Sequence, residues 1–265
     1  MRVVVLFLLS ALLVGCGSSP QKDGYKLVWS DEFDYRGLPD SSRWNYDTVN
    51  NAIGWGNNEA QWYTSENINN ALVSDGTLKI TAIHEEVEGR AFSSARLTTK
   101  HKGDWLYGKI EVRAKLPNAR GIWPAIWMLP TDWVYGGWPK SGEIDILEYV
   151  GYEPDSICAS VHTGRYNHAI NTQKTTPYHL PDTHLNFHVY SLEWDSLQCQ
   201  VWVDDQKYFT FNNEKTDSDA WPFDQSFHLI LNVAVGGNWG GKFGIDTTAF
   251  PQTMEIDYVR VYQKQ

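Results

Sequence analysis

Apolar and polar residues alternate in short runs along most of the chain, and Gly, Pro, Asn and Asp separate these runs. In the clearest run, residues 108–116, Ile110, Val112 and Ala114 alternate with charged residues such as Glu111, which we expect to face outward. Successive side chains of a strand point to opposite faces, so each run predicts a strand with one buried face. Similar strands are predicted at residues 72–73, 77–81, 187–194, 197–204, 227–235 and 254–263.

No stretch of the chain keeps a helical period. Many short strands with regular turn signals therefore predict an all-β fold, either a β-sandwich or a jelly roll. A length of 265 residues suits one large all-β domain or two small domains. Because no linker, repeat or low-complexity tract follows Tyr25, we predict a single domain over residues 25–265.

One strand, at residues 143–149, holds three carboxylates separated only by Ile and Leu. On a regular strand Glu143 and Asp145 share one face, while the isoleucines between them point into the core. Glu148 lies an odd number of positions after Glu143, so strict alternation would bury its carboxylate at a cost of several kcal/mol. We therefore predict a β-bulge near Leu147 that returns Glu148 to the acidic face.

Three carboxylates on one face repel one another, so at least one should keep its proton near neutral pH. A charged carboxylate beside a neutral carboxylic acid is what a glycosidase needs. The alternative is a solvated acidic edge strand. The buried isoleucines and the flanking aromatic residues favour the catalytic interpretation.

The composition narrows the class of substrate. Aromatic residues make up 14% of the chain, with 13 Trp and 14 Tyr, a surplus that suits stacking against sugar rings. The formal net charge is −10, which disfavours nucleic acid, an anionic membrane surface or a polyanionic substrate. We expect a monomer that binds a neutral polysaccharide.

The N-terminus predicts export from the cell. Residues 1–15 combine an early Arg with an apolar run too short to span a bilayer, as in a signal peptide. The run ends at Cys16 in a pattern that resembles a bacterial lipobox, so we predict lipidation of Cys16 and a tether over residues 16–24. The protein is then a periplasmic or cell-surface lipoprotein. The alternative is an ordinary signal peptide with a chance cysteine.

The remaining cysteines, Cys158 and Cys199, fall on different faces of their predicted strands, so we expect no disulfide between them. The Cys and His spacings fit no zinc motif.

The acidic run resembles the active-site signature of glycoside hydrolase family 16, in the longer, bulged form of its laminarinase branch. The resemblance extends over about residues 27–263. It rests on the segments 29–33 (WSDEF), 55–64 (WGNNEAQWYT), 96–100 (RLTTK), 107–117 (YGKIEVRAKLP), 121–130 (GIWPAIWMLP), 143–148 (EIDILE), 160–162 (SVH), 232–239 (NVAVGGNW) and 254–262 (MEIDYVRVY).

This resemblance implies a jelly-roll sandwich of two curved antiparallel sheets with an open concave cleft. By position, Glu143 is the nucleophile, Glu148 the general acid/base, and Asp145 the residue that tunes their charges. A retaining family implies catalytic carboxyl groups about 5–5.5 Å apart. No cofactor is expected for catalysis.

The resemblance also implies residues that bind the sugar chain, and each has an alternative role. Trp123 and Trp127 are expected to stack on sugars, or else to pack in the core. Asn57 and Arg96 are expected to bind sugar hydroxyls, although Arg96 could form a structural ion pair. His162 is expected near Glu148 or the substrate, or as a polar residue without a catalytic role. Trp239 is expected in the cleft, or on a surface loop.

Many members of the family bind calcium on the convex side, with oxygen ligands. The matching positions are the backbone of Glu32 and Gly76 and the backbone and side chain of Asp257. The alternative is no metal at all.

The implied activity is hydrolysis of β-1,3-glucan by double displacement, within the chain rather than at its end. Alternatives within the family are mixed-linkage glucanase, agarase, carrageenase or transglycosylase. An alternative of another class is a glucan-binding protein that has lost catalysis.

Overall fold

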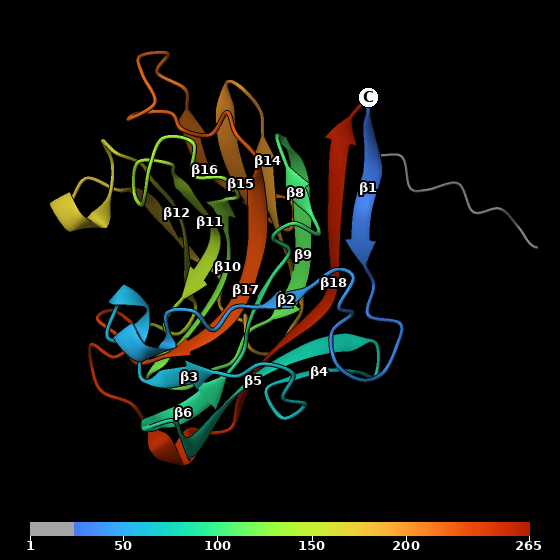
Figure 1. Cartoon of the computed structure of the whole chain (residues 1–265), viewed down its shortest axis with the longest axis vertical. Coiled ribbons are helices and arrows are strands. Elements are labelled where there is room, and N and C mark those ends of the chain that lie inside the picture. The colour runs from blue at the N-terminus through green and yellow to red at the C-terminus, as the bar shows by residue number, and fades with distance from the viewer. Residues whose placement is uncertain (1–23) are drawn as a thin grey trace, which may run out of the picture.

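The computed structural model describes residues 24–265, which fold into two packed β-sheets (Figure 1). The larger sheet has the order β16 (Gln206–Asn212), β15 (Gln198–Val203), β14 (His188–Trp194), β9 (Gly108–Lys115), β18 (Gln252–Lys264), β5 (Thr77–Val87), β6 (Arg90–Ser94) and β3 (Gln61–Tyr63), and β1 (Tyr25–Asp31) and β4 (Ala71–Ser74) pair with β18 and β5. The smaller sheet has the order β13 (Lys174–His179), β12 (Ser156–His162), β11 (Glu143–Tyr149), β10 (Ile122–Pro130), β17 (Phe227–Val235), β7 (Arg96–Thr98) and β2 (Asn45–Tyr46), and β8 (Asp104–Trp105) pairs with β17.

Helical structure in the described residues is limited to three short 3-10 turns: η1 (Asn51–Gly56), η2 (His168–Ile170) and η3 (Thr247–Ala249). All strand pairs are antiparallel except β3 with β6. The predicted all-β sandwich is thus confirmed. The strands predicted from alternation are found within two residues of their expected bounds, except that β5 continues to Val87, six residues beyond its predicted end.

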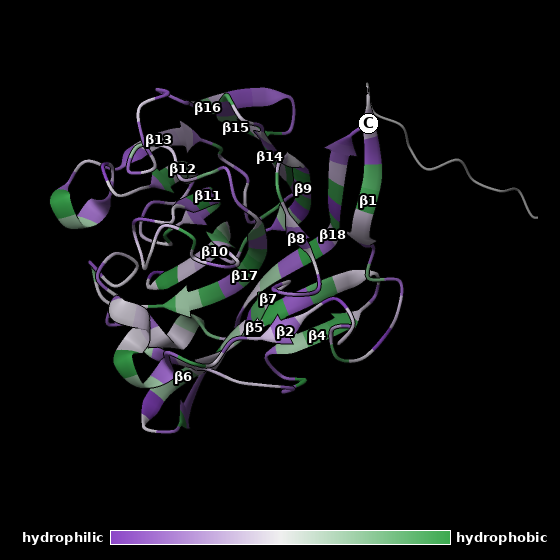
Figure 2. Cartoon of the chain, turned by 45° about the horizontal axis from the view of Figure 1, so that its top comes forward, coloured by the Kyte–Doolittle hydropathy of each residue, from purple (hydrophilic) through white to green (hydrophobic). Residues whose placement is uncertain are grey.

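The core lies between the two sheets and is built from the apolar half of each alternating strand. Ile110, Val112 and Ala114 of β9 are fully buried, as predicted. Figure 2 shows hydrophobic and hydrophilic bands following one another along β1 and β18. Burial of these apolar side chains supplies the main stabilisation of the fold, at roughly 25 cal/mol per Å².

The charged residues of β9 were expected to face outward into solvent, and Glu111 differs from this expectation. It points away from the core, yet only 3% of it is exposed. β9 is an inner strand, with β14 and β18 paired on either side of it, so long neighbouring side chains cover its outer face. Lys109 Nζ lies 3.4 Å from the carboxylate of Glu111, which compensates the buried charge.

The two ends of the described chain meet at one place. β1 runs beside β18, and the Gln265 backbone N–H donates to the Gly24 carbonyl at 3.2 Å (Figure 1). The predicted signal segment and Cys16 lie outside the described residues. Within residues 24–265, no helix has the length and apolar character needed to cross a membrane. Cys158 and Cys199 are free thiols, and Cys199 is buried in the core.

Candidate active site

The acidic strand β11 contains the predicted bulge. Against β10, Asp145 pairs with Trp127 and Leu147 with Ile126, so Ile146 has no partner of its own. The register on the β12 side slips at the same place. Ile146 and Leu147 are both fully buried, and Glu148 returns to the face of Glu143 and Asp145. The prediction of an extra residue near Leu147 is confirmed.

The bulge is secured from the opposite sheet. The extra residue leaves the Ile146 carbonyl outside the regular ladder, and this carbonyl accepts a hydrogen bond from the Tyr208 hydroxyl at 3.2 Å. Tyr208 belongs to β16 of the larger sheet. The hydrogen bond satisfies a polar group that would otherwise be buried without a partner.

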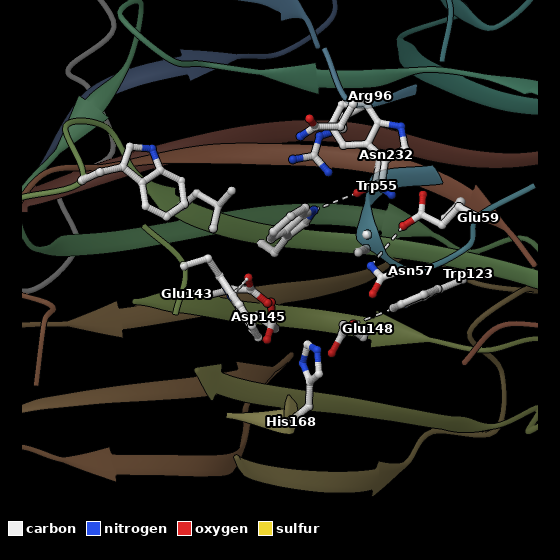
Figure 3. Close-up of a pocket in the computed structure, with 18 residues that line it drawn as sticks. Trp55, Asn57, Glu59, Arg96, Trp123, Glu143, Asp145, Glu148, His168 and Asn232 are labelled. Carbon is white, nitrogen blue, oxygen red and sulfur yellow. Dashed lines mark hydrogen bonds between the residues drawn. The ribbon is translucent and has the colours of Figure 1, made fainter. Parts of the chain in front are cut away.

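The three carboxylates open into a cavity of about 340 Å³ on the smaller sheet. Figure 3 shows Glu143, Asp145 and Glu148 on one side of this cavity, with Trp123 beside Glu148 and His168 below them. Other lining residues come from strands and loops distant in sequence, including Trp55, Asn57, Arg96, Trp127, Trp138 and Asn232. A large aromatic content with a few convergent polar groups is typical of a carbohydrate site.

Each glutamate has an indole N–H as a hydrogen-bond donor. Trp138 Nε1 donates to Glu143 Oε2 at 2.8 Å, and Trp123 Nε1 donates to Glu148 Oε1 at 3.2 Å. Trp123 therefore lies in the cavity and not in the core. Because an indole is a donor only, both contacts orient the carboxylates and favour their ionised forms.

Electrostatics separate the carboxylates from ordinary surface acids. Burial, followed by the charge of Asp145, raises the pKa of Glu148 well above its usual range. The same two causes raise the pKa of Glu143, while His162 and the Trp138 hydrogen bond oppose the rise. Burial also raises the pKa of Asp145. The arrangement can keep one group as a neutral acid while a neighbour carries charge.

His162 lies beneath the carboxylates and does not line the cavity. It pairs with Glu143 in the β11–β12 register, and only 6% of it is exposed. Its Nε2 atom is 3.4 Å from Asp145 Oδ2 and 3.8 Å from Glu143 Oε1. His162 can therefore act on these two carboxylates. It is not placed to contact a sugar in the cavity directly.

Arg96 forms the structural ion pair that was the alternative role expected for it, and it also lines the cavity. Its Nε donates to Asp47 at 3.1 Å, which is the structural ion pair, and its guanidinium is held between aromatic rings. The ring centroids of Trp55 and Trp127 are 4.2 and 4.6 Å from the Arg96 guanidinium carbon. Trp127 Nε1 in turn donates to Asn232 at 2.7 Å. Trp55, Arg96, Trp127 and Asn232, which come from four separate segments, thus form one wall of the cavity.

Asn57 lines the cavity and is oriented by a buried acid. Its Nδ2 donates to Glu59 at 3.3 Å (Figure 3). Gln61 donates to the same carboxylate at 2.6 Å. Trp239 lies instead at a smaller adjoining cavity of about 190 Å³, which shares Glu148 with the larger one. The Trp239 and Trp123 rings meet edge to face with centroids 5.4 Å apart.

Sequence reasoning missed several of the residues that line the cavity. Trp138 and Trp133 lie in the loop between β10 and β11, and His168 lies in η2, and no sequence pattern marks any of the three. The His168 ring packs on Trp138 at 4.8 Å between centroids. Trp55 and Asn232 belong to segments that resemble the family. Only the contact of Trp55 with Arg96 and the hydrogen bond of Asn232 with Trp127 identify them as site residues.

The positions expected to bind calcium lie near one another on the larger sheet. Asp31 pairs with Val259 and Leu78 with Ile256, so Glu32 and Gly76 both come close to Asp257 along β18. The Asp257 side chain already accepts a hydrogen bond from Arg113, and the Glu32 carboxylate is bound by Arg260. Carbonyl oxygens of these segments remain suitable ligands for a hard cation.

A jelly-roll sandwich with paired glutamates in an aromatic-lined cavity defines a glycoside hydrolase. The family model of glycosyl hydrolases family 16 matches residues 52–260. The chain belongs to this family.

Comparison with known proteins shows which members of the family this chain resembles. The chain is 50% identical to a beta-glucanase of Rhodothermus marinus over 97% of this chain and 93% of the relative. The crystal structure of the laminarinase from Rhodothermus marinus matches with a TM-score of 0.88 and 51% identity, over 90% of this chain and 97% of that one. SCLam, a non-specific endo-β-1,3(4)-glucanase, matches with a TM-score of 0.88 and 47% identity, over 92% and 93% of the two chains.

Proposed function

We propose that the chain is a retaining endo-β-1,3-glucanase that acts on laminarin-type glucan. The observation that carries this proposal is the bulge in β11, which places Glu143 and Glu148 on one face of the cavity with Asp145 between them. The similarity to laminarinases supports the β-1,3 linkage. No cofactor takes part in the reaction, because two carboxyl groups suffice for both steps.

In the first step, the Glu143 carboxylate attacks the anomeric carbon while the Glu148 carboxylic acid gives its proton to the glycosidic oxygen. The bond between that carbon and oxygen breaks, and the aglycone leaves as an alcohol. The raised pKa of Glu148 keeps the proton available for this transfer. The indole N–H of Trp138 holds Glu143 in an orientation suited to attack.

In the second step, the Glu148 carboxylate takes a proton from water, and the resulting oxygen nucleophile attacks the anomeric carbon. The ester bond to Glu143 breaks, and the sugar is released with its original configuration. Asp145 and His162 lie against Glu143 throughout, so they adjust its charge as the ester forms and breaks.

The mutational test changes one glutamate at a time. Glu143→Gln and Glu148→Gln keep the side-chain shape and should each remove most activity on laminarin, measured as reducing ends released. Glu143→Ala should recover activity with azide on an activated substrate and yield a glycosyl azide of inverted configuration. The exposed acid Glu86 on β5 of the larger sheet offers a control, since Glu86→Gln should retain activity. Two fully active glutamine variants would refute the assignment.

A second candidate is cleavage of mixed β-1,3-1,4-glucan, which the similarity to the non-specific enzyme favours. A reducing-end assay on laminarin, lichenan, agarose and carrageenan separates these possibilities. Activity on laminarin alone supports the first proposal, and comparable activity on lichenan supports the second. Tight binding without release of product would instead indicate a glucan-binding protein.

We also propose that calcium joins the N-terminal strand to β18 through Glu32, Gly76 and Asp257. Removal of the ion by EDTA should lower the melting temperature without abolishing turnover, because these residues lie on the sheet opposite the cavity. Added calcium should restore the melting temperature. A melting curve that EDTA leaves unchanged, together with no calcium by elemental analysis, would contradict the site.

Export and anchoring complete the proposal. We propose that a lipid on Cys16 tethers the domain over residues 25–265 to a bacterial membrane, in the periplasm or at the cell surface, and that the domain is a monomer. Radiolabelled palmitate should enter the wild-type protein and not Cys16→Ser.

A further inference from the structure

Three potential metal ligands converge behind the catalytic face. They are one oxygen each of Glu143 and Asp145 and a ring nitrogen of His162, and the three atoms lie within 4.8 Å of one another. Two neighbouring strands supply them, since Glu143 and Asp145 belong to β11 and His162 pairs with Glu143 from β12. No spacing in the sequence marks this group, because the strand register alone brings His162 to the acids.

One oxygen atom in this group has no hydrogen-bond partner among the described residues. Asp145 Oδ2 is buried and accepts no hydrogen bond from any described residue. His162 Nε2 lies 3.4 Å from this oxygen, beyond the usual range of a good hydrogen bond. A buried carboxylate oxygen without a donor is costly, so a ligand that accepts its electron pair would remove an unfavourable feature of the site.

The spacing of the atoms suits a tetrahedral cation. Zinc bonds of about 2.0–2.2 Å to nitrogen and oxygen place neighbouring ligand atoms about 3.3–3.5 Å apart. The distance from His162 Nε2 to Asp145 Oδ2 is 3.4 Å, and the distance to Glu143 Oε1 is 3.8 Å. Because Glu143 and Asp145 line the cavity, the fourth ligand position faces its interior.

The donor types select among cations. Zinc binds imidazole nitrogen and carboxylate oxygen, and its open sites have three protein ligands, which is the number present here. Calcium and magnesium prefer six or more oxygen ligands, which these residues do not supply. Copper(II) also favours imidazole, but a tetragonal arrangement suits it better than this one.

We propose that Glu143, Asp145 and His162 form a zinc-binding site whose occupation reversibly inhibits the enzyme. A Glu143 oxygen bound to zinc cannot attack an anomeric carbon, and the open fourth position of the ion points into the cavity that the sugar must enter. Zinc and glucan therefore exclude each other. This site is distinct from the calcium positions, which lie on the other sheet.

Binding is tested on the whole protein after treatment with EDTA and desalting. Calorimetric titration with zinc chloride should show one site, and Co²⁺ should give the visible absorption of a tetrahedral complex that zinc displaces. Asp145→Asn and His162→Asn should each weaken zinc binding by more than about tenfold, since each removes one ligand. Melting curves recorded without metal establish that both variants are folded.

The chain offers a matched control in His188. This histidine also lies between two carboxylates, Asp182 at 3.1 Å and Asp204 at 2.8 Å, but on the other sheet. His188→Asn should leave zinc affinity unchanged. Loss of binding in His188→Asn with undiminished binding in Asp145→Asn would overturn the proposal, as would the absence of any zinc binding.

Kinetics supply an independent result. Zinc should inhibit laminarin hydrolysis competitively, and EDTA should restore the rate. Zinc binding that leaves the KM for laminarin unchanged would overturn the proposed overlap with the substrate. The Co²⁺ spectrum does not depend on turnover, so a failure of the glucanase assignment and a failure of the metal site give different results.

Discussion

At the scale of single residues, the site depends on donors that a linear pattern does not reveal. Trp138 shows this most clearly, since its N–H lies 2.8 Å from the Glu143 carboxylate and its ring packs against His168. The hydrogen bond stabilises the charged form of Glu143 and lowers a pKa that burial raises. A hydrogen bond to a charged group contributes about 1.5–3 kcal/mol, enough to affect catalysis measurably.

Trp138→Phe keeps an aromatic ring and removes the N–H donor. The pKa of Glu143 should then rise, so the acidic limb of the pH profile of kcat/KM should move to higher pH. We expect kcat to fall about tenfold or more, because the nucleophile loses both orientation and charge stabilisation. Trp133→Phe in the same loop is the matched control and should leave the acidic limb in place. An acidic limb that does not move in Trp138→Phe would contradict the positioning role.

At the scale of elements, one extra residue in β11 determines which side chains reach the cavity. The bulge turns Glu148 toward the site, and Tyr208 holds the bulged carbonyl from the opposite sheet. The two sheets are therefore coupled at the point where the catalytic geometry is set. Loss of this coupling should affect stability and activity together.

Tyr208→Phe removes only the hydroxyl that donates to Ile146. The free energy of unfolding should decrease by about 1 kcal/mol, because a buried carbonyl loses its hydrogen bond. Activity should decrease as the bulge becomes less well defined. Urea denaturation and the laminarin assay measure both effects. Tyr178→Phe, whose ring centroid is 5.2 Å from that of Tyr208, is the control and should change neither quantity appreciably.

The sequence predicted the regular part of the molecule better than its loops. Alternation located the strands because burying one face of a sheet requires a period of two residues. The position of Glu148 also predicted the bulge, since a charged group on the wrong face is costly. Trp138, His168 and Asn232 could not be predicted in the same way, because their roles depend on which distant segments the topology brings together. Glu111 shows a related limit, since alternation gives the face of a residue but not its exposure.

At the scale of the whole molecule, the buried carboxyl groups of the active site decrease the stability of the fold as the pH rises above the acidic range. Folding buries three carboxyl groups whose pKa values are raised by that burial. Their protonated forms are favoured in the folded state, so the folded protein binds more protons than the unfolded chain. Stability from these groups is fully present below the unfolded pKa of about 4.3 and is lost as pH rises through the raised folded pKa.

Glu148→Gln removes one of these ionisations and should therefore stabilise the fold at neutral and alkaline pH. We expect the free energy of unfolding of the variant to exceed that of wild type at pH 8, because glutamine has no proton to lose, whereas burial raises the pKa of Glu148. The difference from wild type should vanish near pH 4. Urea denaturation at the two pH values measures it. Equal stability of the variant and wild type at pH 8 would show that ionisation of the buried Glu148 does not destabilise the fold.

The meeting of Gly24 and Gln265 has a practical consequence for use of the protein on solid material. Both ends of the described chain leave from the sheet that does not carry the cavity. A bead or resin coupled through the C-terminus at Gln265 would therefore hold the molecule with the cavity turned away from the support. Insoluble fibres could reach an immobilised preparation without obstruction by the support.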